Sequence, residues 1–357
     1  MWLARLGSLN ALAQTRRSPF WRRFLGASLP SADTLGRVPE RLAADSLREA
    51  LHQIYTRLKR NKALPATSHG LTALVLDGHE THASYHRHCA TCSVRLVGSE
   101  GQPRRQFYHR VVSALLLSGD LRLWLDVEPQ GPGEDEIAAG VRLLKRVLDR
   151  YPRAFDVVLG DALYTDPRLY AVVLSHGKDV LSVLKNEDRD LVKDARALFA
   201  TFPPQALSDD CRAWDVAGLE SWPQAGRAVR VVRTLETRTS RPPAPRAESE
   251  WLWVTTLSTH RACTRAIIEL GHARWDIENQ GFNEFAHRWL ADHVYRHHPN
   301  ALLSFWLLGM IAFNVFFAFA RRNLQPECRR RFSHLHVARC LAEEIYDGLA
   351  LPDPRAP

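Results

Sequence analysis

Hydrophobic residues recur every three or four positions in several otherwise polar stretches of the chain. This spacing predicts amphipathic helices over residues 45–60 and 134–150. The second helix should stop before Pro152, because proline disrupts a helix interior. Ser31 offers an N-cap for a shorter helix that runs to Arg41. Further helices are expected at 167–175, 189–200 and 264–291.

Short apolar runs without helical spacing predict strands that are buried inside a sheet. Two such runs, at 71–76 and 155–160, each end directly before an aspartate. Paired strands at 106–117 and 121–127 flank Ser118-Gly119-Asp120, which is a hairpin turn signal. A third buried strand is expected at 180–184. The alternation of strands and helices from about residue 155 onward indicates an α/β protein.

The pattern changes between residues 201 and 256, where proline is frequent. Three strand-like pieces and a polar loop over 238–249 indicate a β-strand insertion whose loop we expect to be disordered. The strand-like pieces are at 212–216, 229–234 and 251–256.

An uncharged apolar segment, 301–320, is long enough to cross a membrane and is followed by Arg321 and Arg322. Ser304, Gly309 and Asn314 interrupt it, and a buried helix in a large domain has the same composition. We expect a buried helix with a partner for the Asn314 amide. A membrane-anchored basic protein is the alternative from another functional class.

Composition and charge add a polyanion-binding surface to this picture. The 357 residues are 45% hydrophobic and 24% charged, which excludes collagen-like and largely disordered classes. Of the net charge of +9, residues 1–64 carry +8. Arginines alternate with aromatic residues near the start, which suits contact with a nucleic-acid backbone, although a transit peptide has a similar composition. These arginines are Arg16, Arg17, Arg22 and Arg23.

Three carboxylates form a candidate metal site. Asp77 and Asp161 each follow a buried strand, and neighbouring strands would bring them together at the carboxyl edge of the sheet, where they could hold Mg²⁺ or Mn²⁺. Glu278 could complete a two-metal site, and Arg274 shares its helix face and could contact phosphate. The alternatives are ordinary turn or capping aspartates and a surface ion pair.

Six cysteines are too few and too scattered for a secreted disulfide framework, so a reducing cytosol is expected. Cys89 and Cys92 lie in a histidine-rich stretch, where one or two upstream histidines could complete a zinc site. A lone CxxC lacks the second half of such a site, so zinc binding remains open. The upstream histidines are His79, His82, His86 and His88.

Five segments together resemble the DDE transposases of bacterial insertion sequences, in the branch with a β-strand insertion between the second Asp and the Glu. The segments are LPSADTLGRV (29–38), RLKRNKAL (57–64), LVLDGHE (74–80), VVLGDALY (157–164) and ARWDIENQGFNEF (273–285). The resemblance spans residues 16 to 322. It implies an RNase H-like mixed-sheet core and two Mg²⁺ (or Mn²⁺) ions bound by Asp77, Asp161 and Glu278.

The resemblance also implies roles in DNA contact. Arg274 matches the arginine of a Tyr-Arg-Glu-Lys signature, but Gly271 stands where Tyr is expected and Phe285 where Lys is expected. The nearest following base is Arg288. Trp214 and Trp222 lie where similar transposases offer a ring to stack an extruded base, although the more common role of such residues is in the core of a small β unit.

These observations predict a metal-dependent transposase that cleaves and transfers DNA strands at insertion-sequence ends. An inactive or truncated relative that only binds DNA is the alternative. The expected divisions are a basic DNA-binding helical region (1–64), a catalytic core in two parts (65–200 and 257–325), the insertion (201–256) and a basic tail (326–357). Expected partners are double-stranded DNA and a second copy of the chain, with no membrane, in the bacterial cytoplasm at the nucleoid.

Overall fold

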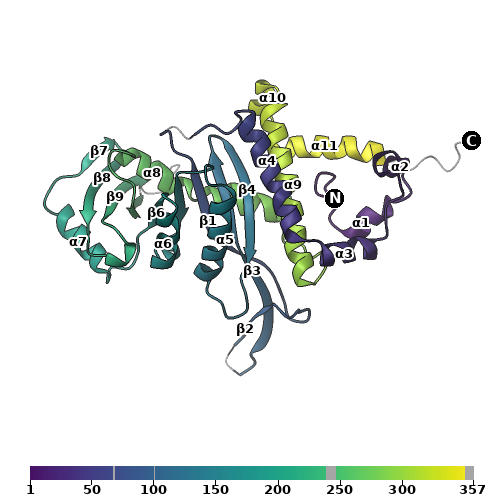
Figure 1. Ribbon diagram of the computed structural model, residues 1–357, viewed down its shortest axis with the longest axis horizontal. Coiled ribbons are helices and arrows are strands. Elements are labelled where there is room, and N and C mark those ends of the chain that lie inside the picture. The colour runs from purple at the N-terminus through teal and green to yellow at the C-terminus, as the bar shows by residue number, and fades with distance from the viewer. Residues whose placement is uncertain (67–68, 100, 239–246, 350–357) are drawn as a thin grey trace, which may run out of the picture.

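The computed structural model describes residues 1–66, 69–99, 101–238 and 247–349. A long mixed sheet runs through the molecule, with helices from both ends of the chain gathered at one end of it (Figure 1). The strands are β1 (Ala73–Ser84), β2 (Ser93–Val97), β3 (Arg104–Ser118), β4 (Leu121–Pro129), β5 (Val157–Gly160), β6 (Asp179–Val183), β7 (Gln205–Ser208), β8 (Cys211–Leu219), β9 (Val229–Arg238) and β10 (Ala247–Thr255).

The helices lie on both faces of this sheet and at its end. They are α1 (Leu9–Gln14), α2 (Pro19–Leu25), α3 (Ala32–Arg41), α4 (Ala44–Arg60), α5 (Glu136–Arg150), α6 (Pro167–Ser175), α7 (Asp190–Phe199), α8 (Thr264–Ala273), the π-helix η3 (Ile277–Arg288), α9 (Pro299–Arg322), α10 (Pro326–Arg331) and α11 (His334–Leu349). Two short 3₁₀ turns are η1 (Ala162–Tyr164) and η2 (Pro223–Ala225). The predicted α/β class is therefore confirmed.

The sheet order is β2-β3-β1-β5-β6-β10-β9-β8-β7, and β4 also pairs with β3. Strand β1 runs antiparallel to β3 but parallel to β5, and β5 is parallel to β6. The predicted hairpin is confirmed, with Ser118 opposite Leu121 across the turn. Because β1 and β5 are parallel, both run toward the same edge of the sheet, where ligands commonly bind in α/β proteins.

Two hydrophobic clusters fill the space on either side of the sheet, because successive side chains of a strand point to opposite faces. Leu74 and Leu76 of β1 join the cluster that contains α5, α6 and α7. Ala73 and Val75 join the cluster that contains α8, η3 and α9. By the same alternation Asp77 faces α8 and η3, whereas Gly78 faces α5.

The 201–256 region extends the central sheet rather than forming a separate layer. Strand β10 pairs antiparallel with β6, and β9, β8 and β7 follow outward. Each of the three predicted strand pieces falls on β8, β9 or β10. Strand pairing reaches Arg238 and resumes at Ala247, so the strands are longer than the alternation predicts, and residues 239–246 of the expected disordered loop lie outside the described residues.

Two predicted boundaries were wrong. Strand β1 does not end before Asp77 but continues to Ser84, because β3 pairs with it along its whole length. The predicted helix 264–291 is broken after Ala273 and resumes as the π-helix η3, in which the Trp289 amide donates to the Glu284 carbonyl five residues earlier. Such π-helical turns often occur at functional sites.

Helix α9 contains the predicted apolar segment and packs against β4. The buried Asn314 amide donates to the Trp124 carbonyl at 2.8 Å and accepts from the Trp124 N–H at 2.9 Å. It thereby satisfies a backbone position on β4, and the expected partner for Asn314 is confirmed. Among the described residues α9 alone is long and apolar enough to cross a membrane, and half of its apolar window is buried inside the protein.

Buried charges attach the N-terminal helix α4 to the sheet. The Asp126 carboxylate on β4 accepts hydrogen bonds from Arg48 Nε of α4 at 2.9 Å and from Arg146 Nε of α5 at 2.6 Å. Leu51 and Tyr55 of α4 enter the two clusters that cover the sheet. In contrast, α1 contributes Leu12 to a smaller separate cluster near the N-terminus. Helix α4 is therefore part of the structural core.

Candidate active site

Strand register brings Asp77 and Asp161 to the same level of the sheet. Val75 on β1 lies opposite Leu159 on β5, and two further residues along each strand lead to Asp77 and Asp161. Asp161 also caps η1, since its Oδ1 accepts a hydrogen bond from the Leu163 N–H at 2.8 Å. The capping role that the sequence left open is thus present beside the site, and it orients the carboxylate.

Arg274 and Glu278 approach from the break between α8 and η3. Arg274 Nη1 lies 3.0 Å from Glu278 Oε1 and 3.9 Å from Asp77 Oδ2, so one guanidinium contacts carboxylates from two elements. Arg274 is buried, and its Nε has no hydrogen-bond partner among the described residues. Glu278 is half-exposed. The site therefore combines a buried cation with an acidic group that solvent can reach.

The carboxylates at this edge influence one another strongly. Burial, together with the charges of Asp161, Glu278 and Glu136, raises the pKa of Asp77 to about 7, although Arg274 acts in the opposite direction. Several like charges thus gather with one arginine to offset them. The structure brings Asp77, Asp161, Glu278 and Arg274 close to one another.

Glu136 is a fourth carboxylate that the sequence reasoning missed. It is the first residue of α5, and it accepts a hydrogen bond from the Tyr164 hydroxyl at 3.0 Å. Burial raises its pKa, and the charge of Asp161 adds to this effect. A Cβ at Gly78 would lie 2.3 Å from Glu136 Oε2, so only glycine lets this carboxylate approach β1 so closely. The glycine that follows Asp77 was the available signal in the sequence.

The donor set at this edge suits a hard divalent cation. Carboxylate oxygens are the ligands that Mg²⁺ and Mn²⁺ prefer, and three or four of them meet here. Burial is the main cause of the raised pKa of Asp77, the neighbouring carboxylates add to it, and Arg274 is the one cation that opposes it. A divalent cation would supply the missing positive charge, so the residues fit a metal site.

Replacing Asp77 by Asn should stabilise the metal-free protein at pH 8. Because the folded-state pKa of Asp77 is raised to about 7, its stabilising contribution is present below about pH 4 and is lost as pH rises through 7. Asp77→Asn removes the ionised form, so its melting temperature should exceed that of the wild type at pH 8 and the difference should shrink at pH 5. Thermal unfolding in buffer without magnesium or manganese gives the melting temperatures of both proteins at both pH values. A lower melting temperature at both pH values would contradict this, and exposed Asp209→Asn is the control.

Packing accounts for the two positions that depart from the family signature. A Cβ at Gly271 would lie 2.4 Å from Trp253 Nε1, so the indole of β10 occupies the space that a tyrosine would need. Phe285 is fully buried, and its ring packs against Trp124 and Trp306. Neither position therefore offers a polar side chain to DNA.

The two tryptophans proposed to stack an extruded base are placed differently. Trp214 is only 9% exposed, and Arg233 covers its ring at 4.4 Å. Trp222 is partly buried against Tyr170. This placement favours the core role for Trp214, because a stacking platform must present a free ring face. Trp222 is the more accessible of the two.

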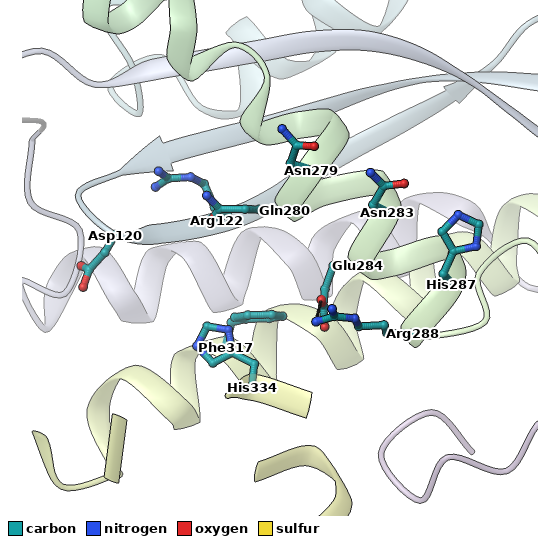
Figure 2. Close-up of a pocket in the computed structure, with 10 residues that line it drawn as sticks. All are labelled: Asp120, Arg122, Asn279, Gln280, Asn283, Glu284, His287, Arg288, Phe317 and His334. Carbon is teal, nitrogen blue, oxygen red and sulfur yellow. Dashed lines mark hydrogen bonds and ion pairs between the residues drawn. The ribbon is translucent and has the colours of Figure 1, made fainter. Parts of the chain in front are cut away.

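Arg288 lines a polar hollow of about 450 Å³ on the other side of η3 (Figure 2). Its guanidinium lies 2.8 Å from Glu284, and Phe317 of α9 and His334 of α11 lie opposite. A neighbouring hollow is lined by Arg321, Arg329 and Arg330. The basic residues that follow Glu278 therefore gather around η3, α9 and α10 rather than in the acidic site.

Four arginines near the N-terminus are exposed. Arg16 and Arg17 lie between α1 and α2, and Arg22 and Arg23 lie on α2. In the ranges that the structure describes, no ion pair involves any of them. The exposed Phe24 ring stacks on Phe20 at 5.5 Å between the ring centroids. These four residues, Arg16, Arg17, Arg22 and Arg23, thus present positive charge in the same segment as exposed or partly exposed apolar rings.

Comparison with known families agrees with this geometry. The sequence model of the transposase DDE domain matches residues 71–315, which is more than half of the chain and includes Asp77, Asp161 and Glu278. The protein therefore belongs to the DDE transposase family, whose members act on DNA as nucleases and strand transferases and generally use divalent metal ions. No curated protein matches the chain.

Proposed function

We propose that the protein cleaves DNA at the ends of a bacterial insertion sequence and joins the freed strand to target DNA. The observation that carries this proposal is the meeting of Asp77, Asp161 and Glu278 around Arg274 in a chain of this family. The core strands lie in the order β4-β3-β1-β5-β6. Neighbouring strands from β4 to β1 are antiparallel and those from β1 to β6 are parallel, which supports an RNase H-like core. The β7–β10 extension supports the branch with a strand insertion.

Each side chain has a distinct proposed task. Asp77, Asp161 and Glu278 would hold two Mg²⁺ or Mn²⁺ ions, and such ions would supply charge stabilisation and an activated nucleophile for an in-line displacement. Arg274 would bind the scissile phosphate, since its buried Nε lacks a partner within the described residues and guanidinium groups bind phosphate in a fork. Glu136, held by Tyr164, would orient Asp161 through their mutual repulsion.

DNA would extend from this site over the basic surfaces. Arg288 lies on the same π-helix as Glu278, and the arginines of the adjacent hollow come from α9 and α10. Helix α11 leads from that hollow toward α2, which carries Arg22 and Arg23 (Figure 1). We propose that the protein acts as a homodimer on paired DNA ends, with Trp222 near the extruded base, in the bacterial cytoplasm at the nucleoid.

The direct test is metal-dependent nicking of DNA that carries the element's terminal inverted repeat. Purified full-length protein should nick at the repeat boundary with Mg²⁺ or Mn²⁺ and not without them. A scrambled repeat is the control. Because Gly271 and Phe285 supply no polar contact, a relative that only binds DNA is the second candidate. Specific binding without nicking in either metal would establish that candidate and overturn the proposal.

Neutralising the N-terminal arginines should weaken DNA binding and its salt dependence. Each lost phosphate contact lowers the slope of log affinity against log salt by about 0.9, so replacing all four by glutamine should lower it by roughly 3 to 4. Fluorescence anisotropy on a labelled repeat at several salt concentrations gives this slope. Glutamine substitution of the ion-paired Arg196 and Arg212 is the control. An unchanged slope would show that DNA binds a part of the protein other than these four arginines.

A further inference from the structure

Two cysteines and two histidines meet beside β3, away from the carboxylate site. Cys89 and Cys92 come from the loop between β1 and β2, His109 from β3, and His297 from the segment before α9. Their ligand atoms all lie within 4.8 Å of one another. Cys92 and His109 are buried, and the other two are partly buried.

The separations among these atoms match a tetrahedral zinc site. With Zn–S near 2.3 Å and Zn–N near 2.0–2.1 Å, the edges of the tetrahedron are about 3.8 Å between sulfurs and about 3.6 Å between sulfur and nitrogen. The two Sγ atoms are 3.7 Å apart. Cys92 Sγ lies 3.1 Å from His109 Nε2 and 3.7 Å from His297 Nε2, and Cys89 Sγ lies 3.3 Å from His109 Nε2.

The local backbone favours metal-bound thiolates over a disulfide. The Cys89 N–H donates to Cys92 Sγ at 3.2 Å, and a hydrogen bond of this kind stabilises a thiolate. A disulfide would hold the sulfurs at about 2.05 Å, and both cysteines are free. Two sulfurs and two imidazoles are the donor set of structural zinc sites, whereas Mg²⁺ and Mn²⁺ prefer oxygen.

We propose that Cys89, Cys92, His109 and His297 bind one structural zinc ion. Four protein ligands complete the tetrahedron, so no position remains for substrate. The ion would connect the β2–β3 arm, which projects from the sheet, to the start of α9 (Figure 1). It would also fix the far end of β1, the strand that carries Asp77. The proposal does not depend on the proposed catalytic function.

The histidines that the sequence indicated are not the ligands. His86 and His88 are exposed, and His79 contacts Asp292 at 3.0 Å instead. His82 packs against the rings of His109 and His297 without joining the ligand set. The missing half of the site comes from residues 17 and 205 positions beyond Cys92, which spacing alone does not reveal.

Metal analysis of the purified full-length protein tests the proposal. Mass spectrometry should find about one zinc per chain, and Cys92→Ser should lower this at least roughly tenfold, since thiolates dominate such sites. His86→Ala in the same loop and Cys263→Ser on the surface should keep the full content. Zinc-free wild-type protein from zinc-supplemented cells, or full zinc in Cys92→Ser, would overturn the site.

A variant that keeps four metal ligands controls for the case in which Cys92→Ser loses zinc because it fails to fold. His297→Cys should still bind one metal, now with three thiolates. Cobalt(II) in place of zinc should give the visible bands of a tetrahedral ion in both proteins, with sulfur-to-cobalt absorption about one half stronger in His297→Cys. Octahedral cobalt spectra, or no gain in the sulfur-to-cobalt absorption, would exclude His297 as a ligand and contradict the proposal.

Discussion

Asp161→Asn is expected to abolish metal-dependent DNA cleavage while DNA affinity stays within about twofold. The amide keeps the shape of the side chain and can still cap η1 by accepting from the Leu163 N–H. It removes the negative charge that a divalent cation needs. Loss of one metal ligand should cost about 4 kcal/mol of transition-state stabilisation, or roughly 10³-fold in rate.

The matched control for this variant is Asp166→Asn. Asp166 caps the next helix, α6, in the same way, but it pairs with Arg168 outside the acidic site. Single-turnover nicking and anisotropy on the same repeat DNA measure cleavage and binding for both variants. Cleavage by Asp161→Asn at a wild-type rate would remove Asp161 from the mechanism. Equal losses in both variants would indicate a folding effect.

Asp126→Ala should lower the free energy of unfolding by about 3 kcal/mol, because it removes the carboxylate shared by the buried Arg48 and the partly buried Arg146, which then keep their weaker or more exposed contacts with Glu128 and Asp45. Asp126 is 2% exposed, and it joins Arg48 of α4 to Arg146 of α5 across β4.

Urea unfolding followed by circular dichroism gives this free energy by linear extrapolation. Glu248→Ala is the control, because its ion pair with Arg212 is exposed and should contribute at most about 1 kcal/mol. A loss below about 1 kcal/mol for Asp126→Ala would show that water or another acidic side chain compensates the two arginines.

Local patterns predicted the elements well where one principle decided the structure. The apolar stripe of α5 and the turn between β3 and β4 both appear as expected. The first strand was predicted to end before Asp77 because its apolar run stops there. It continues because β3 pairs beyond that point, and such a long-range contact leaves no local trace.

The sequence could not predict features that depend on contacts between residues far apart in the chain. Glu136 begins a helix whose pattern predicts only its buried face, and its approach to the site depends on the absence of a side chain at Gly78. The carboxylate motifs were visible because their order along the chain matched a known family.

The most direct test of the central claim is a crystal structure of the protein soaked in Mn²⁺, with anomalous diffraction to locate the metal. The account predicts manganese between Asp77, Asp161 and Glu278, with two ions about 4 Å apart when DNA is bound. Manganese bound only elsewhere on the protein would contradict it. So would an acidic site that contains no metal in the presence of DNA and Mn²⁺, with Arg274 as its one positive group.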